Sequence, residues 1–300
     1  MNVKKIVIFV SVFLIIITGV IIALFISFRE HTYRILKIYQ IEGEANVYRK
    51  EIGDISPYNN MVLESGDRVS LKKGTLNIQA DEDKYIYLEE GTEIELKASG
   101  DSVNSKTSIE LLKGAITNDI ANQLPEEAAY EVNTPNSTMS VRGTIFRVYI
   151  YELDGVKYTR VSVFDGKVTT KLVYKDGTVA DNEVAVEKGK EVLIYEDDKT
   201  TDYVSAPTDI DYDTLPEDVL RRLKANNDNG RQVSITNPEI DRILEGPYIV
   251  RFMYSGKQFG TQTVKKGEKV VRPTLKPSTS GDWDFDFSTP INRDCVIEWK

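Results

Sequence analysis

One apolar run near the N-terminus constrains this 300-residue chain more than any other feature. Residues 6–28 contain no charged side chain, and 18 of these 23 positions are Ile, Leu, Val or Phe. At 1.5 Å per residue, a helix of this length measures about 35 Å, slightly more than the roughly 30 Å hydrocarbon core of a bilayer. The sequence therefore predicts one transmembrane helix over residues 6–28, preceded by a short cytoplasmic tail of residues 1–5.

A signal peptide or a buried core helix fits this run less well. A cleaved signal peptide has an apolar region of about 7 to 15 residues and a small-x-small cleavage site, whereas this run is longer and ends in Ser27-Phe28-Arg29-Glu30. A buried core helix has a much shorter apolar stretch. We therefore expect an uncleaved anchor that crosses the membrane once.

The charges do not fix the orientation of the span, but they exclude one class of partner. Lys4 and Lys5 precede the run and three basic residues follow it by residue 37, so both flanks are basic. The first 40 residues hold five of the 38 basic and one of the 47 acidic residues, which leaves 33 basic and 46 acidic residues in the body. Because nucleic-acid binding needs a basic face, we expect no nucleic-acid partner.

The scarcity of His and Cys limits the chemistry of the chain. His31 and Cys295 are the single representatives of their types, which excludes a His/Cys zinc set, a Ser-His-Asp or Cys-His pair in the body, and an internal disulfide. The acidic run at 209–213 begins like a calcium loop, but Thr214 and Leu220 stand where that loop needs Gly and Glu. We therefore predict no cofactor, no metal and no catalytic residue.

The body of the chain has the pattern of a β protein. Residues 37–195 are a succession of short runs in which apolar and polar side chains alternate, as in Thr75–Ala80, Lys84–Leu88, Thr92–Leu96 and Lys167–Tyr174. Glycines lie at or near the expected turns: Gly66, Gly74, Gly91, Gly114, Gly166, Gly177 and Gly189. The pattern favours a mainly β fold, a solenoid or sandwich of short strands.

Residues 201–245 are predicted to be a connector with short helices. One helix begins near Pro216, carries acids in its first turn and bases near its end, and stops at the Asn-rich stretch 226–230. A second is expected over 238–244.

Residues 246–300 read as a separate small β domain. Ser255-Gly256 predicts a two-residue hairpin. The alternation of acids and aromatics at 282–287 predicts a strand with one solvent face. Cys295 is expected to be a small buried apolar residue. The basic residues between 265 and 272 are expected to lie in a solvated turn rather than to bind anionic wall polymer.

A more specific motif lies at residues 132–148. An expected strand ends at Thr134-Pro135, a loop follows, and then comes Val-Arg142-Gly143-Thr144-Ile-Phe146. With this motif, residues 37–200 resemble the FecR domain. Further features of that family are Leu63-Glu-Ser-Gly-Asp-Arg-Val, Leu111-Leu-Lys-Gly-Ala-Ile, Val161-Ser-Val-Phe-Asp-Gly-Lys-Val and Val186-Glu-Lys-Gly.

The resemblance implies an extracytoplasmic β-solenoid-like domain, known in Gram-negative bacteria as the periplasmic part of iron-uptake regulators that contact a receptor's signalling domain. Those regulators carry a cytoplasmic segment that handles a sigma factor. Only residues 1–5 precede the span here, so we expect no direct sigma-factor control and do not carry over ferric citrate. The motif itself is read as mainly structural, because Gly143 permits a backbone conformation that other residues resist and a half-buried Arg142 satisfies several carbonyls.

The C-terminal part resembles a bacterial surface repeat, the InlB B-repeat or Listeria-Bacteroides repeat, which implies a β-grasp-like fold. The matching positions are Tyr248, Val250, Phe252, residues 264–270, Pro273, Trp283 and residues 296–299. Such repeats mark cell-surface proteins, which favours a body outside the cytoplasm.

The sequence as a whole predicts a non-enzymatic binding or sensory protein of the bacterial envelope. Its expected partners are the membrane, through the single span, and an unknown envelope protein or cell-wall polymer. Two alternatives stay open: an enzyme that acts on glycans with a pair of carboxylates, and a passive surface spacer.

Overall fold

The computed structural model describes Thr18 and residues 36–100, 105–125, 128–195 and 203–300. The predicted tail and anchor therefore lie outside the described residues, apart from Thr18. Within the described part of the chain, no helix combines the length and apolarity needed to cross a bilayer.

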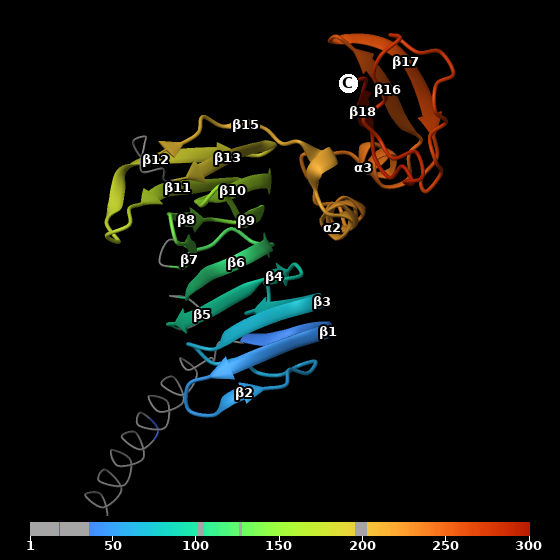
Figure 1. The fold of residues 1–300 in the computed structure, drawn as a ribbon. Coiled ribbons are helices and arrows are strands. Elements are labelled where there is room, and N and C mark those ends of the chain that lie inside the picture. The colour runs from blue at the N-terminus through green and yellow to red at the C-terminus, as the bar shows by residue number, and fades with distance from the viewer. Residues whose placement is uncertain (1–17, 19–35, 101–104, 126–127, 196–202) are drawn as a thin grey trace, which may run out of the picture.

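The main part of the molecule is a stack of strands joined in one 15-stranded sheet (Figure 1). The strands are β1 (Leu36–Arg49), β2 (Gly53–Ile55), β3 (Arg68–Ala80), β4 (Lys84–Leu88), β5 (Glu93–Ser99), β6 (Lys106–Ile120), β7 (Ala129–Thr134), β8 (Ser137–Val141), β9 (Ile145–Leu153), β10 (Val156–Asp165), β11 (Lys167–Val173), β12 (Val179–Glu187), β13 (Lys190–Tyr195), β14 (Tyr203–Val204) and β15 (Thr208–Asp209). The mainly β prediction is confirmed, and the four alternating runs singled out in the sequence fall in strands except for the end residues Thr92 and Tyr174.

The long strands belong to two layers at once. The first half of β3 pairs with β5 and its second half with β4. Likewise, β6 pairs with β5 and β7 over its first half, and with β4 and β9 over its second half. The apolar side chains of both halves, such as Leu71, Ile78, Ile109 and Ile116, are buried in one continuous core. The strands thus form one continuous sheet around a single core, and the long strands bend to pair with different neighbours along their length.

Glycines inside strands make these bends possible. Gly43 of β1 pairs with Gly74 of β3, and their φ angles are +112° and +95°. A Cβ on Gly43 would lie 2.1 Å from the Lys73 carbonyl oxygen, so the two backbones approach as closely as only glycine allows. The prediction that Gly74 and Gly114 lie at turns is wrong, because both are inside long strands.

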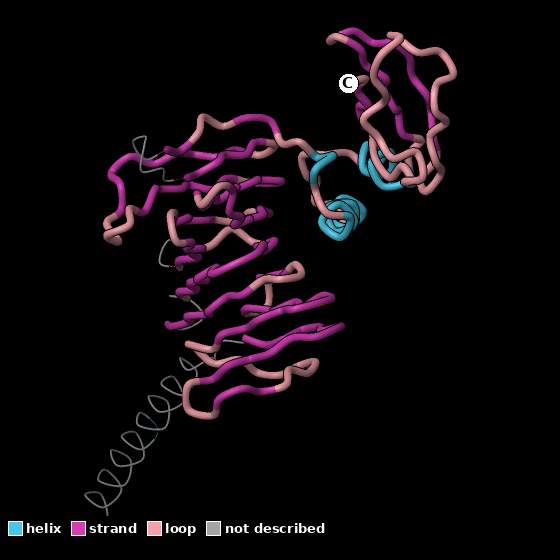
Figure 2. Tube along the Cα trace, viewed as in Figure 1, coloured by secondary structure: helices cyan, strands magenta, loops and turns pink. Residues whose placement is uncertain are grey.

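The connector packs on the sheet. After the short 3₁₀ helix η1 (Tyr212–Thr214), α2 (Glu217–Asp228) and α3 (Asn237–Glu245) bury their apolar faces against Ile145 and Phe164. Both predicted helices exist, although α2 includes the asparagines expected to end it. The helices of the described residues all lie in this connector, apart from Thr18 (Figure 2).

The C-terminal unit is a small mixed sheet in the order β17-β16-β18. The antiparallel hairpin of β16 (Tyr248–Tyr254) and β17 (Lys257–Val264) confirms the Ser255-Gly256 prediction, and β18 (Cys295–Glu298) runs parallel to β16. The predicted strand at 282–287 is absent from this described region, where Trp283 makes an isolated bridge to Trp299. The acids there are held by turns and ion pairs, which mimic strand alternation in the sequence. Cys295 is partly exposed rather than fully buried.

Candidate functional site

The first half of the predicted motif organises a buried polar network. Thr134 ends β7, the exposed Pro135 turns the chain, and the buried Asn136 follows. The Asn136 Oδ1 accepts hydrogen bonds from the hydroxyls of Thr134 (3.2 Å) and Thr159 (2.6 Å). Its Nδ2 donates to one backbone carbonyl of β10 (3.2 Å) and one of β13 (3.3 Å). Asn136 therefore joins the β7–β8 hairpin to strands of the other layer.

The second half of the motif links β8, β9 and β11. The buried Thr144 hydroxyl donates to the Lys167 carbonyl (3.0 Å), and Phe146 is fully buried in the core. Gly143 has a φ of +67°, and a Cβ there would lie 3.0 Å from a neighbouring backbone. Arg142 is exposed rather than half-buried and borders a hollow of about 490 Å³. The motif residues are thus dispersed and do not form one site.

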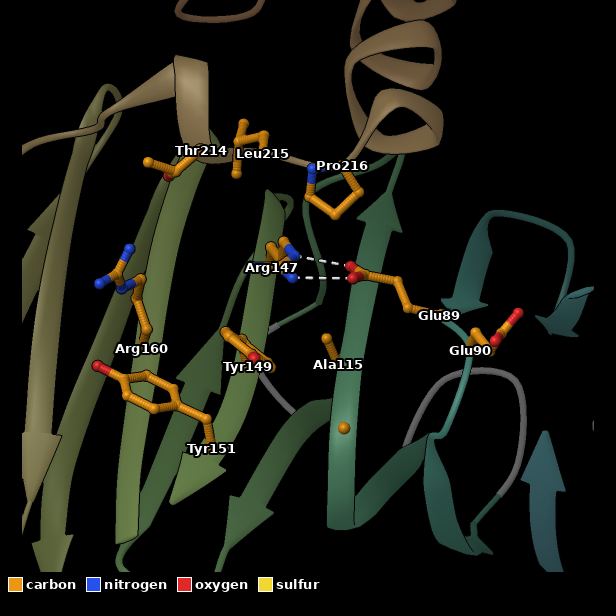
Figure 3. Close-up of a pocket in the computed structure, with 11 residues that line it drawn as sticks. Glu89, Glu90, Ala115, Arg147, Tyr149, Tyr151, Arg160, Thr214, Leu215 and Pro216 are labelled. Atoms are coloured by element: carbon orange, nitrogen blue, oxygen red, sulfur yellow. Dashed lines mark hydrogen bonds and ion pairs between the residues drawn. The ribbon is translucent and has the colours of Figure 1, made fainter. Parts of the chain in front are cut away.

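A trough on the outer face of the sheet is the clearest candidate for a binding site (Figure 3). Its volume is about 540 Å³. Gly114 and Ala115 of β6 contribute small residues to its lining, and connector residues 214–216 close one side. Its larger side chains are two acids, two arginines and two tyrosines: Glu89, Glu90, Arg147, Arg160, Tyr149 and Tyr151. The lining is therefore balanced in charge, and it lies within the size range of small-ligand pockets.

An ion pair forms one wall of the trough. Arg147 donates from Nε and Nη2 to the two carboxylate oxygens of Glu89, at 2.6 and 2.8 Å. The side chains are 8% and 17% exposed, and the Arg147 guanidinium lies 4.8 Å from the centre of the Tyr149 ring. Such a two-pronged pair is strong and fixes geometry. Because it occupies both oxygens of Glu89, this trough does not present two free carboxylates for glycoside hydrolysis.

A row of tyrosines leads out of the trough across three strands. The ring centres of Tyr149 and Tyr151 lie 5.1 Å apart, those of Tyr151 and Tyr158 5.1 Å, and those of Tyr158 and Tyr195 5.2 Å. Arg160 lies 6.0 Å from the Tyr151 ring. Partly exposed Tyr and Arg side chains held in fixed positions are the types that dominate binding energy at interfaces.

The connector is clamped to the sheet next to this trough. The Arg222 guanidinium lies 3.9 Å from the centre of the Tyr87 ring, a cation–π contact. Arg231 donates to the carboxylates of Asp119 (2.5 Å) and Asp165 (3.0 Å). Burial raises the pKa of the Asp119 carboxyl, against the opposing effect of Arg231.

The same connector is tied to the C-terminal unit. Arg242 of α3 lies 3.3 Å from the carboxylates of both Asp213 and Asp294, and Lys266 lies 3.2 Å from Glu217 of α2. Two of the basic residues considered for wall-polymer binding, Lys266 and Arg272, are therefore paired within the protein.

The half-buried Tyr87 gives the protein a specific alkaline sensitivity. Burial raises the pKa of Tyr87 to about 12, with a further contribution from Asp119. The corresponding stability is present below the unfolded pKa of about 10 and is lost as the pH rises towards 12, by up to about 2–3 kcal/mol. We expect urea unfolding between pH 10 and 12 to show a steeper loss of stability in the wild type than in Tyr87→Phe. Parallel losses in both proteins would contradict this assignment. Burial also raises the pKa of Tyr130, but both proteins share that effect.

The acidic run considered for calcium serves other purposes. Asp209 pairs with Lys190 (2.7 Å), Asp211 accepts from the Asp213 backbone amide (3.2 Å), and Asp213 pairs with Arg242. Among the described residues there is no cluster of three or more His, Cys, Asp or Glu side chains placed to hold a metal ion.

Sequence reasoning missed the trough residues. A usable signal exists in β9, where Arg147, Tyr149 and Tyr151 alternate with core residues and so share the face expected to meet water. Large aromatic side chains on that face indicate a covered or binding surface. The sequence of connector residues 214–216, which close one side of the trough, carries no such signal.

One comparison with known proteins finds a family match inside the main β part of the chain. The model of the FecR family, described as FecR protein, matches residues 67–169, a narrower range than the predicted 37–200. A search of curated proteins finds no match. Two crystal structures of a "putative anti-sigma factor" from Parabacteroides distasonis ATCC 8503 are similar, each with a TM-score of 0.40. Their identities are 12% and 13%, over 78% and 77% of this chain and 98% and 97% of theirs. The chain is therefore similar to the FecR family over residues 67–169, a stretch that begins just before β3 and ends in β11.

Proposed function

We propose that this chain is a membrane-anchored, extracytoplasmic binding or sensory protein of the bacterial envelope, which works by contact with a partner rather than by catalysis. The match of residues 67–169 to the FecR family carries this proposal. The apolar run at 6–28 supports the single span, and the FecR resemblance supports a body outside the cytoplasm.

The trough is the proposed contact site for that partner, an envelope protein or a cell-wall polymer. Its Tyr149, Tyr151 and Arg160 side chains are partly exposed, while Arg147 is fixed by Glu89. This arrangement presents rigid side chains, so binding costs little conformational entropy.

The C-terminal unit is proposed to be a β-grasp-like surface repeat of the InlB B-repeat type. The hairpin, the parallel β18 and the buried Trp283 and Trp299 are compatible with this assignment. Its contacts with the connector make it an extension of the FecR domain.

Protease treatment of intact cells tests the orientation. With an epitope tag after Lys300, we expect external protease to remove the tag while a cytosolic control protein stays intact. A tag that survives removal of the wall, and is cut only after the membrane is opened, would place the body in the cytoplasm and overturn the proposal.

Site-specific photo-crosslinking tests the trough. A photoreactive phenylalanine analogue at Tyr151 is expected to form a discrete adduct with an envelope component in living cells. The same residue at Val179, which is 49% exposed on the edge strand β12 and does not line the trough, is the control. Equal labelling at both positions, or none at Tyr151, would argue against the trough as the contact site.

A further inference from the structure

One end of the stack of strands is closed by a segment that exposes apolar side chains. Residues 50–63, here called the end segment, run along the free edge of β1. The backbone amide of Leu63 donates to the Leu36 carbonyl (2.8 Å), and that of Ile38 donates to the Met61 carbonyl (2.9 Å). The segment therefore protects an edge strand from pairing with another chain.

Several side chains of the end segment that face solvent are apolar. Met61 and Leu63 are each 4% exposed and point into the core. Between and before them, Val62 is 67%, Tyr58 62% and Ile52 67% exposed. Val62 lies beside Lys37 near the start of β1, and Ile52 lies near the other end of this strand, so the exposed apolar side chains are spread along the edge that the segment covers. A row of exposed apolar side chains along one edge favours a surface that is covered in the working state.

The position of this segment in the chain identifies what covers it. The inference rests on the proposed anchor, which ends at Phe28. Leu36 begins β1 only eight residues later, so an extended chain places Leu36 at most about 29 Å from the end of the span. Val62 lies beside this point, because it forms a bridge with Lys37. The opposite edge strand, β12, is eight strand spacings away, roughly 38 Å.

We propose that the end segment rests on the lipid surface of the membrane that holds the anchor, with Val62, Tyr58 and Ile52 in the interfacial layer. Aliphatic side chains enter this layer and tyrosine rings settle at headgroup level. The proposed anchor holds the end segment close to the bilayer, so the local lipid concentration is high. A contact between the segment and lipid that would be too weak for free association is therefore populated.

The charges around the end segment indicate which lipids are needed. Arg49 pairs with Glu64 (2.6 Å), and Asp54 accepts a hydrogen bond from an Asn46 amide (2.6 Å). Arg49 also pairs with Asp67 (2.6 Å), so with Lys50 and Glu51 the group holds two positive and four negative charges. Anionic lipids therefore offer it little attraction, and docking on zwitterionic vesicles is expected to be at least as strong as on anionic ones.

The test uses the full chain reconstituted in phosphatidylcholine vesicles. In a Cys295→Ser background, a single cysteine replaces Val62 and carries an environment-sensitive fluorophore; the matched control carries it at Val179 on β12. We expect the label at 62 to be quenched several-fold more by a lipid-borne quencher than the label at 179, and less by aqueous iodide. Ile52→Asp is expected to move the label at 62 towards the values of the control.

The outcomes separate the inference from the anchor on which it rests. Protein that floats with the vesicles while the label at 62 behaves like the label at 179 overturns the docking and leaves the anchor intact. Protection of position 62 from iodide without lipid quenching means contact with a second copy and also overturns it. Protein that does not float overturns the anchor, and the docking with it.

Discussion

Replacing Arg147 with Met is expected to destabilise the protein by about 3 kcal/mol. The change leaves the Glu89 carboxylate, which is 17% exposed, without the two hydrogen bonds that compensate its burial. Breaking one side of a buried pair costs about 3–5 kcal/mol, and the residual exposure of Glu89 places this case at the lower end. Urea unfolding monitored by tyrosine and tryptophan fluorescence measures the loss.

Two further variants show whether burial of the charge is the cause. Arg147→Met combined with Glu89→Gln is expected to recover most of the loss, because no uncompensated charge remains. Arg68→Met is the matched control, since the Arg68–Glu95 pair is 47% and 27% exposed and is expected to contribute less than about 1 kcal/mol. If the double variant is as unstable as the single one, lost packing rather than charge explains the effect.

Asn136→Ala is expected to cost about 3–4 kcal/mol, although the residue touches no proposed ligand. The change removes the acceptor of the Thr134 and Thr159 hydroxyls and the donor to the Lys157 and Ile194 carbonyls. Each buried polar group left without a partner costs about 1–3 kcal/mol, and the losses within one network are not additive.

The control for Asn136 is another asparagine with a single exposed contact. Asn122→Ala loses one hydrogen bond to Asp83 (3.1 Å) and is expected to change stability by less than about 0.5 kcal/mol. Equal midpoints for the two variants in urea would contradict the assignment of Asn136 as the junction between the layers. Asn136→Asp is expected to resemble the alanine variant, because it also loses the two donors.

Local patterns predicted the strands well, and non-local pairing explains the errors. Period-two alternation located β4 and β11, and Ser255-Gly256 located the C-terminal hairpin. Gly74 did not mark a turn, because a glycine between two apolar runs also suits a bent strand. The choice between a turn and a bent strand depends on its pairing with Gly43, 31 positions earlier in the chain.

The candidate site depends on still longer connections. The trough needs β6 beside β9 and a connector that folds back from residue 214, contacts that no local window contains. Asn136 is equally hard to find, because its importance depends on carbonyls 21 and 58 residues later in the chain. The resemblance around Arg142–Phe146 identified the domain, but its residues mainly hold strands together.

The double attachment of the connector has a mechanical consequence. Arg242 and Lys266 fasten it to the C-terminal unit, and Arg222 and Arg231 fasten it to the sheet. A load applied to the C-terminal unit therefore reaches these side-chain contacts before it strains any ladder of backbone hydrogen bonds. Residues 214–216 lie on that load path, so tension would widen the trough while the strands stay intact. The width of the trough would then vary with the load on the C-terminal unit.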